Sequence, residues 1–587
     1  MFVLDCEVYS NYFLFAAKQI NGDKTLVVEM HNDKCSDKDR RAVDKAMSSA
    51  IGVSFNGNNY DLPIIASFLA GASNADLKTM SDKIIVDQVP SWRLGVRIPK
   101  KWDHIDLFEV SFGRASLKIY GGRLGCPKMQ DLPIEPSATI SEVQAKELRD
   151  YCSNDLDVTE RLYNALAPQI ELRKSMSDQY GIDLRSKSDA QIAEAVIKSE
   201  YLKLSGDMAY KPESIASEFY YVAPDLVSFS SKYLSDILTR IHETPFALGK
   251  NGSVLLPDWL KSERIVIDNT PYQMGIGGLH SCEKRQFVGA DKDHLLFDMD
   301  VASYYPNIIL EQGLEPESMT GHFINVYESL VDRRIVAKRS GDKVTADTLK
   351  ICVNGSFGKL GSKYSALYAP ELLIQTTITG QLALLMLIER MTDVGIRIMS
   401  ANTDGIVCHV PIELECAAQQ VAFDWMLDTT YVLERTDYRA LASRDVNNYV
   451  AVKLDGSYKG KGVFADAGLS KNPDMPIIAK AVALYVAKGV AIESTINGCK
   501  DVVQFCTIRT VKGGAQWQGD YLGKAVRFYW GNNIMASPIS YIKNGNKVPK
   551  SDGAIPMMDL PESLPSDIDY PRYIKAAKDL LEDVGLC

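Results

Sequence analysis

Two pairs of carboxylates, each with one residue between its members, could bind divalent cations. Asp5 and Glu7 lie in the apolar run MFVLDCEVYS, and Asp298 and Asp300 end the apolar run HLLFDMDV. Both runs predict a β-strand, on which side chains two apart face the same side and can share a metal ion. Such a pair is also typical of a solvated strand edge, so the spacing alone leaves both interpretations open.

Three single acids stand where the sequence predicts a helix or a turn. Asp61 in GVSFNGNNYDLPII lies where a strand or loop enters a packed helix, and Asp155 follows Tyr151 by four residues, on one face of a helix predicted over 150–166. Asp404 lies in MSANTDGIVCHV, where Asp-Gly between alternating apolar runs predicts a tight hairpin turn. The turn by itself accounts for an acid at 404 without any chemistry.

Length and composition indicate a large globular protein. Its 587 residues predict three or more structural units in two or three larger domains, and a hydrophobic fraction of 46% is typical of soluble proteins. A net charge of −10 argues against a protein that is basic overall, yet nucleic-acid binding needs only a local basic track. The eleven cysteines include no Cys-x-x-Cys pair, so neither a zinc ribbon nor an iron–sulfur site is indicated.

The apolar segments and the cysteines predict a cytoplasmic protein. The segments that begin at Leu382 and Ile477 carry charges and fall short of a bilayer span, so we expect buried helices and no membrane contact. No signal peptide is recognisable, and scattered cysteines without pairs predict free thiols in a reducing compartment.

Three segments of the amino-terminal third resemble the exonuclease motifs of the proofreading domain that precedes family B DNA polymerases. These are DCE, FNGNNYD and YCSND, and HIDLFEV and SLKIYGGRLG resemble what that domain carries between its second and third motifs. Two cations held by such acids can activate a water and stabilise the leaving oxygen of a phosphodiester. Tyr151 would orient the water or the scissile phosphate, and Asp157, off the helical face of Tyr151, is a weaker candidate. The implied metal ligands are Asp5, Glu7, Asp61 and Asp155.

The segment DVASYYPN resembles the first polymerase motif of the same family. The resemblance selects Asp300 over Asp298 as a metal ligand and adds Val301 to the metal site. Tyr305 would pack under the sugar of the incoming nucleotide and leave no room for a 2′-hydroxyl. The sequence departs from this motif at two positions, Tyr304 and Asn307, and we expect the ring of Tyr304 in the core.

Residues 328–360 predict two helices joined at Ser340-Gly341-Asp342 as an antiparallel hairpin. Basic residues on an exposed helix are usually only solvated. However, KICVNGSFGKLG resembles the second polymerase motif, with Gly355 and Phe357 as substitutions. The resemblance implies that cations from both helices grip a triphosphate and align it. The implied nucleotide-binding residues are Tyr305, Arg334, Lys338, Lys350 and Asn354.

The segment SANTDGI, which contains the predicted hairpin turn, resembles the third polymerase motif. Asp404 matches its second aspartate, which pairs with Asp300 across two metal ions, so the turn would be the device that places this acid. Asn402 stands where the family usually has an aspartate, and Gly405 where it has a serine. We therefore expect a working site with one fewer negative charge and weaker metal binding.

The segment RDVNNYVAVKLDGSYKGKGVF resembles the family's region that holds the primer terminus. Tyr449 is in place, but Asn447 stands where a lysine is usual. Lys459 and Lys461 could supply the missing phosphate contact, and all three of Tyr449, Lys459 and Lys461 are therefore candidate DNA-binding residues.

Two other segments are candidates for contact with DNA. GIGGLHS resembles the Tyr-x-Gly-Gly linker motif of small phage polymerases, with Gly275 in place of the tyrosine, and Gly277 and Gly278 would let the backbone approach the template. The helical run from Ile477 and the basic, aromatic AVRFYW suggest a thumb that tracks duplex DNA. A helical domain with an ordinary core explains the same apolar periodicity.

The motifs occur in family order and imply an α/β multidomain fold. An RNase H-like 3′→5′ exonuclease domain would precede a right-hand polymerase core of palm, fingers and thumb. The expected domains are the exonuclease domain (1–170), a connecting region with a template-facing linker (171–290), two palm segments (291–315 and 366–468), the fingers hairpin (316–365) and the thumb (469–587).

The implied activity is template-directed addition of deoxynucleotides to a DNA primer, with proofreading, by a compact phage-like monomer. Each active site would use two Mg²⁺ ions, for which Mn²⁺ could substitute. Only 50 residues separate Asp300 from Lys350 and 54 separate Lys350 from Asp404, which leaves no room for the subdomains that protein-primed phage polymerases insert there. The expected partners are primer–template DNA, deoxynucleoside triphosphates and phage replication proteins, in the cytoplasm of a bacterial host.

Two other functions fit the same residues. An exonuclease whose polymerase half only binds primer–template is favoured by Asn402 and Asn447. A noncatalytic scaffold that binds primer–template is the second, and the intact acids of both sites argue against it. Extension of a primer separates both from a polymerase.

Overall fold

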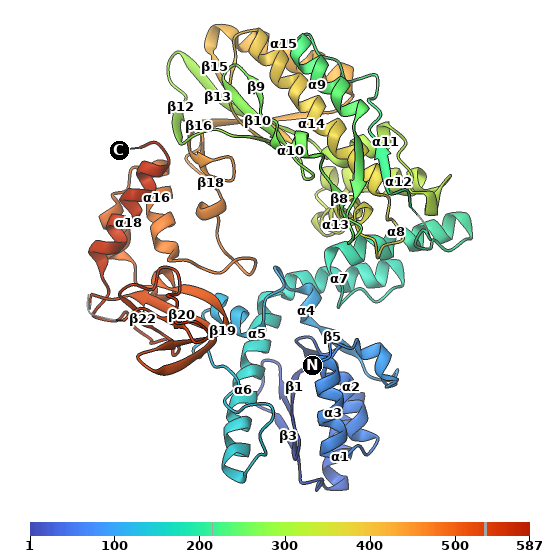
Figure 1. The fold of residues 1–587 in the computed structure, drawn as a ribbon, viewed down its shortest axis with the longest axis vertical. Coiled ribbons are helices and arrows are strands. Elements are labelled where there is room, and N and C mark those ends of the chain that lie inside the picture. Colours follow the sequence, from blue (N-terminus) through green and yellow to red (C-terminus); the bar gives the residue numbers. More distant parts are fainter. Residues whose placement is uncertain (214, 533–536, 587) are drawn as a thin grey trace. The chain divides into compact units, whose positions relative to one another are not determined.

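The structure, a computed structural model, describes residues 1–213, 215–532 and 537–586 as a mixed α/β protein of two compact units (Figure 1). The first unit comprises Met1–Ser188, Ala467–Ile477 and Asn497–Tyr573, and the second comprises Asp189–Asp466, Ile478–Ile496 and Ile574–Cys587. Residues 469–587, predicted as one thumb domain, therefore contribute to both units.

A five-stranded sheet forms the centre of the first unit. Its strand order is β3-β2-β1-β4-β5, in which β1, β2 and β3 are antiparallel and β4 and β5 run parallel to β1. The strands are β1 (Phe2–Tyr9), β2 (Tyr12–Gln19), β3 (Thr25–His31), β4 (Gly52–Ser54) and β5 (His104–Asp106).

The two faces of this sheet are covered by different helices. Successive side chains of β1 point to opposite faces and therefore contact different helices. Leu4 and Cys6 pack with α1–α3, whereas Val3 and Tyr9 pack with α6 on the opposite face. Asp5 and Glu7 share the α6 face because they alternate with the first pair. The helices of this unit are α1 (Asp37–Ser49), α2 (Asp61–Leu69), α3 (Asn74–Ile85), α4 (Leu107–Val110), α5 (Leu117–Arg123), α6 (Glu142–Ala165) and α7 (Ala167–Tyr180).

A second sheet of the first unit has the order β21-β19-β20-β22. The segment AVRFYW, predicted to track DNA, is the end of β20, and its Arg527 is fully buried. The guanidinium donates to the backbone carbonyls of Cys126 and Met557, at 2.9 and 2.8 Å, and is held inside the unit. This cation is therefore not exposed to solvent. The strands are β19 (Thr507–Trp517), β20 (Asp520–Trp530), β21 (Ser540–Tyr541) and β22 (Ala554–Pro556).

A ten-stranded sheet dominates the second unit, with the order β18-β17-β16-β13-β15-β14-β11-β10-β9 and β12 paired to β16. The central strand β13 lies between β15 and β16, antiparallel to both. Its strands are β9 (Ile265–Ile267), β10 (Thr270–Met274), β11 (Leu279–Ser281), β12 (Gln286–Gly289), β13 (His294–Val301), β14 (Arg397–Asn402), β15 (Gly405–Pro411), β16 (Leu433–Asp445), β17 (Asn448–Lys453) and β18 (Tyr458–Lys461).

Helix α14 (Pro370–Asp393) packs on this sheet with α15 (Glu415–Thr429). Helix α14 is 24 residues long, so the expectation that the segment from Leu382 falls short of a bilayer span was wrong. It is the one described helix long and apolar enough to cross a membrane, but 78% of its most apolar window is buried inside the protein. Its apolarity is that of a core helix.

Three helices of the second unit form a separate group. The predicted hairpin consists of α12 (Phe323–Ser340) and α13 (Lys343–Leu360), joined at Gly341, whose φ of 76° ends α12. Helix α8 (Asp189–Ser205) crosses α13 at Gly355, where an added Cβ would lie 2.8 Å from Cβ of Ala193. Lys359 of α13 and Glu194 of α8 form an ion pair at 3.0 Å.

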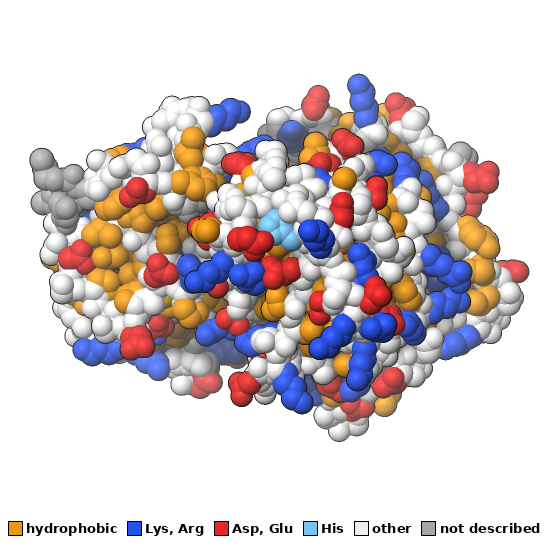
Figure 2. All heavy atoms as spheres, turned by 90° about the horizontal axis from the view of Figure 1, so that it is seen from below, with side chains coloured by type: hydrophobic (Ala, Val, Ile, Leu, Met, Phe, Trp, Pro, Cys, Tyr) orange, Lys and Arg blue, Asp and Glu red, His pale blue; other side chains and the backbone are white. Residues whose placement is uncertain are grey.

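Further helices and strands complete the described part of the chain. They are β6 (Glu218–Tyr220), β7 (Pro245–Leu248), β8 (Val254–Leu255), α9 (Lys232–Glu243), α10 (Asp258–Ser262), α11 (Tyr304–Glu311), α16 (Pro476–Lys488), α17 (Ile492–Gly498) and α18 (Tyr570–Asp583). Acidic and basic side chains are interspersed on the face drawn in Figure 2, so the negative net charge is not gathered into one area there.

Candidate functional sites

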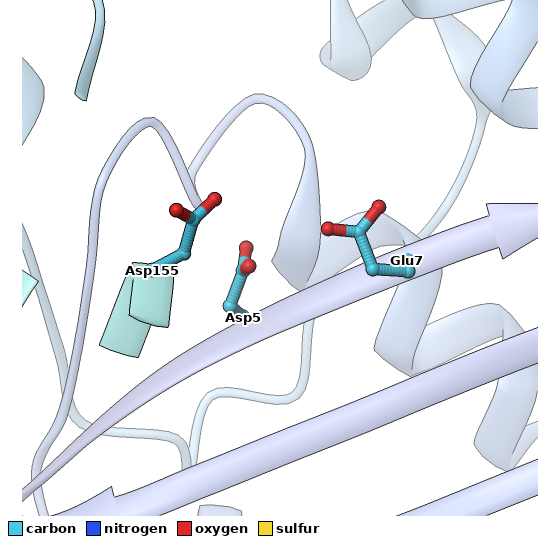
Figure 3. A group of neighbouring side chains, drawn as sticks. All are labelled: Asp5, Glu7 and Asp155. Atoms are coloured by element: carbon cyan, nitrogen blue, oxygen red, sulfur yellow. The ribbon is translucent and has the colours of Figure 1, made fainter. Parts of the chain in front are cut away.

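Three carboxylates meet on the α6 face of the first sheet. Asp5 and Glu7 project from β1 toward Asp155 of α6, and one oxygen atom of each lies within 4.8 Å of the others (Figure 3). Carboxylate oxygens in this arrangement are suitable ligands for a divalent cation. Strand and helix together thus unite acids that are about 150 positions apart in the sequence.

The fourth predicted acid, Asp61, begins α2 and lies outside this group of three. It is buried, and its Oδ1 has no hydrogen-bond partner among the described residues. The preceding loop is fixed by Asp106, whose carboxylate accepts from the backbone N–H groups of Asn56 and Asn58 at 2.8 and 2.9 Å. A buried carboxylate oxygen without a hydrogen-bond partner is a suitable ligand for a cation.

Lys118 of α5 is the residue of this site that sequence analysis did not single out. Its ammonium forms an ion pair with Asp155 and lies 4.1 Å from the ring centroid of Tyr151. Lys118 was inside a segment that resembled the family, SLKIYGGRLG, but nothing in its spacing indicated a partner 37 residues away. It places a positive charge against the acid cluster.

Burial governs the protonation of this cluster. Burial, and after it the nearby charge of Asp155, raises the pKa of Asp5 to about 7. The pKa values of Glu7, Asp61 and Asp155 are also raised, first by burial, although Lys118 lowers the pKa of Asp155. Two buried and two half-buried acids that resist ionisation are well suited to a cation, since its charge would compensate theirs.

In the second unit, the ladder between β13 and β15 brings Asp300 beside the hairpin that carries Asp404. Asp300 is paired with Gly405, and the backbone N–H of Val301 donates to the carbonyl of Asp404 at 2.7 Å. The turn consists of two residues, Thr403 and Asp404, with φ of 63° at Thr403. The tight turn that the sequence predicted is thus also the element that places Asp404.

A cavity of about 160 Å³ opens beside these two acids. Tyr449 is among its lining residues, and its charged and amide lining comprises Asp298, Asp300, Asn402, Asp404, Lys459 and Lys461. Strands β17 and β18 pair Tyr449 with Lys461, whose ammonium lies 6.0 Å from the tyrosine ring. The lysines and the acids therefore face the same cavity. Opposite charges around a polar cavity can bind a phosphate and a cation together.

The acids of this cavity differ in their surroundings. Asp298 accepts a hydrogen bond from the hydroxyl of Tyr438 at 2.9 Å, and burial raises its pKa to about 6, with a smaller effect from Asp300. Burial also raises the pKa values of Asp300 and Asp404. Asn402 donates from its amide to the carbonyl of Val446 at 3.0 Å and adds no charge.

Tyr305 lies between the two predicted glycines and the helical hairpin. Its ring stacks on Phe357 of α13 with centroids 4.4 Å apart, and its hydroxyl donates to the carbonyl of Gly277 at 2.9 Å. A Cβ at Gly278, where φ is 144°, would lie 3.0 Å from Cα of Thr403. Gly278 therefore permits close contact inside the protein, a role that its resemblance to a template-facing linker did not indicate, whereas an added Cβ at Gly277 would meet nothing within 4 Å.

The predicted nucleotide-binding cations differ in their partners. Arg334 donates to the hydroxyl of Ser303 at 2.9 Å, next to the first-motif strand, and Lys338 lies 3.6 Å from Glu434. Lys350 and Asn354 are exposed on α13. The structure thus brings Arg334 to Ser303, three residues after Asp300, and leaves the other three side chains exposed on the hairpin.

No protein-family model matches the chain, and no curated protein sequence matches it. Among solved structures, the chain is similar to the family B DNA polymerase from the hyperthermophilic archaeon Pyrobaculum calidifontis, with 15% sequence identity over 99% of this chain and 77% of that one, at a TM-score of 0.42.

Proposed function

We propose that the protein is a template-directed DNA polymerase with a 3′→5′ exonuclease in the same chain. The observation that carries the proposal is the meeting of Asp300 and Asp404, which are distant in sequence, in one cavity with Lys459 and Lys461. Two acids for cations and two lysines for phosphates are the groups that phosphoryl transfer requires.

In the proposed polymerase site, Asp300, Asp404 and the backbone oxygen of Val301 would hold two Mg²⁺ ions. Bound there, the ions would lower the pKa of the primer 3′-hydroxyl and neutralise charge on the α-phosphate. Tyr305, packed on Phe357, would bar a 2′-hydroxyl from the sugar pocket. The residues proposed to grip the triphosphate are Arg334, Lys338, Lys350 and Asn354.

The primer–template would lie against a second set of residues. Tyr449 and the lysines of β18 line the cavity from the side opposite the hairpin turn in the strand order. Gly277 and Gly278 are proposed to let the template approach near Tyr305. A lysine ammonium binds phosphate as a point charge and tolerates any base sequence, as a polymerase needs.

In the proposed exonuclease site, Asp5, Glu7, Asp61 and Asp155 would hold the second pair of ions, which would generate the attacking hydroxide. Tyr151 would orient that water or the scissile phosphate. Lys118, paired with Asp155 and lying over the Tyr151 ring, would fix both side chains. The RNase H-like fold and the right-hand arrangement of palm, fingers and thumb belong to the same proposal.

The setting of the enzyme completes the proposal. We infer a phage-like monomer that works in the cytoplasm of a bacterial host, on primer–template DNA and deoxynucleoside triphosphates, with phage replication proteins as further partners. Mn²⁺ could replace Mg²⁺, since both accept carboxylate oxygens.

Extension of a labelled DNA primer on a longer template tests both sites together. The wild type should lengthen the primer with Mg²⁺ and deoxynucleotides, Asp404→Ala should only shorten it, and Asp5→Ala should only lengthen it. A wild type that shortens the primer at every deoxynucleotide concentration would favour the alternative, an exonuclease whose polymerase half only binds primer–template. Asn402 supports that alternative because it leaves the cavity one acid short.

A further inference from the structure

An exposed tryptophan lies on the first unit between α3 and β5. Trp92 belongs to a short 3-10 helix (Ser91–Leu94), and its side chain is 73% exposed. The guanidinium carbon of Arg93 lies 4.8 Å from the centroid of the indole ring and covers part of it. An exposed aromatic ring beside a guanidinium offers a surface on which an unpaired base can stack.

Cations follow this ring along the chain. Arg93, Arg97, Lys100 and Lys101 are exposed, and among the described residues Lys101 is the one that pairs with an acid, Asp44, at 2.8 Å. The neighbouring acid Asp103 is itself neutralised by Arg185 at 2.8 Å, and Asp87 remains exposed. Residues 91–100 therefore carry three exposed cations that form no ion pair with an acid of the described residues, a charge that suits a polyanion.

The tryptophan segment is joined to the acid cluster through one loop. The hydroxyl of Ser91 donates to the carbonyl of Asn58 at 3.4 Å, and Asn58 stands three residues before Asp61. Asp106 fixes the backbone of that loop, so the position of Ser91 relative to Asp61 is set. The side chains of Asn58 and Asn59 in this loop are exposed.

We propose that residues 91–97 bind single-stranded DNA and present its 3′ end to the carboxylates. Trp92 stacks with an unpaired base, and Arg93 and Arg97 contact its phosphates. A single strand is favoured over a duplex because the faces of paired bases are hidden, and over a protein partner because the cations lie beside the ring. The proposal rests on the proposed exonuclease function, since it supplies that site with its substrate.

Binding of a short, fluorescent single-stranded oligodeoxynucleotide, measured in chelator so that no cleavage occurs, tests the surface directly. Trp92→Ala should weaken binding about tenfold, the loss expected for one stacked base, while Trp92→Phe should retain most of the affinity. Arg97→Gln should weaken binding and reduce its dependence on salt. Tyr220→Ala, which removes a ring 58% exposed in the second unit, is the matched control and should bind as the wild type does.

Three results would overturn the proposal. They are an unchanged affinity in Trp92→Ala, an equal loss in Trp92→Ala and Trp92→Phe, and an equal loss of affinity for blunt duplex DNA. Unchanged thermal unfolding of Trp92→Ala, expected for an exposed side chain, would show that the variant is folded.

Degradation kinetics separate this proposal from the function on which it rests. With Mg²⁺, Trp92→Ala should raise KM for single strands about tenfold and leave kcat unchanged, because the ring binds DNA away from the reacting bond. If the wild type degrades no DNA, the exonuclease proposal fails, while the binding measurement in chelator still decides whether the surface takes single strands. If the wild type degrades DNA and KM does not change in Trp92→Ala, only the present inference fails.

Discussion

The carboxylate of Asp300 lies against the backbone of Gly405, in the place where a side chain at 405 would begin. A Cβ on Gly405 would be 2.2 Å from Oδ1 of Asp300 and 3.0 Å from the carbonyl oxygen of Met299. The absence of a side chain at 405 is thus a condition for the position of Asp300, and a serine at 405 would not fit this arrangement.

Gly405→Ala should therefore displace Asp300 and lower primer extension by about 10²-fold, the effect of roughly 1 Å of misplacement at a reacting centre. Exonuclease activity should not change, since its acids belong to the other unit. Gly498→Ala, where an added Cβ meets nothing within 4 Å, is the matched control. Full extension activity in Gly405→Ala would show that Asp300 is not required where it lies.

Lys118→Met should lower exonuclease activity by about 10- to 100-fold, as expected for a group that orients metal ligands. Methionine keeps the length of the side chain but leaves Asp155 buried without its cation, so the free energy of unfolding in chelator should fall by about 3 kcal/mol. Lys118→Arg should recover part of both losses. Rates of single-strand degradation and thermal unfolding measure the two effects, and primer extension should not respond.

Asp5→Asn should stabilise the metal-free protein increasingly as pH rises. The pKa of Asp5 is about 7 in the folded protein, above its usual 3.8, so the folded state favours the protonated acid. Its contribution to stability is present below pH 4 and is lost as pH rises toward 7. The difference in free energy of unfolding between Asp5→Asn and the wild type should grow by up to about 1.4 kcal/mol for each pH unit in that window.

Chemical denaturation in chelator at pH 4 to 8 measures this difference. Mg²⁺ should reduce it, because a bound cation stabilises ionised Asp5 in the wild type. A difference that is constant from pH 4 to 8 would contradict a raised pKa for Asp5.

Asn402→Asp should lower the Mg²⁺ concentration needed for half-maximal primer extension, because it adds an acid to the cavity of Asp300 and Asp404. The same change should lower the free energy of unfolding by about 1–3 kcal/mol, since a carboxylate cannot donate to the carbonyl of Val446 as the amide does. Asn402→Ala separates the effects: it removes the donor without adding charge and should leave the Mg²⁺ requirement unchanged or higher. An unaltered Mg²⁺ requirement in Asn402→Asp would place position 402 outside the metal site.

Local patterns predicted the elements that carry the acids. The alternation around Asp5 and Glu7 corresponds to β1, the spacing of Tyr151 and Asp155 to α6, and the Asp-Gly pair at 404 to the turn between β14 and β15. In each case the decisive interactions lie within a few residues of one another, and a sequence records such interactions directly.

Contacts between distant segments were not predictable in this way. Arg527 lies in a basic, aromatic segment, yet its guanidinium is buried and donates to the carbonyls of Met557 and of Cys126, the latter 401 positions earlier in the chain. The sequence around Lys118 did not indicate its ion pair with Asp155. The sequence of residues 265–281 did not indicate that they extend the large sheet through β9, β10 and β11. The partners of a buried cation or an added strand are set by tertiary packing, which local spacing does not encode.

The strand β18 has a further consequence for the behaviour of the molecule in solution. It is only four residues long, lies at one end of the strand order of the large sheet, and carries Lys459 and Lys461. An open sheet edge invites another chain to add a strand, and short edges with lysines discourage it. The lysines proposed to hold DNA would then also protect this sheet against aggregation, so replacing both with apolar residues should cost solubility as well as DNA binding.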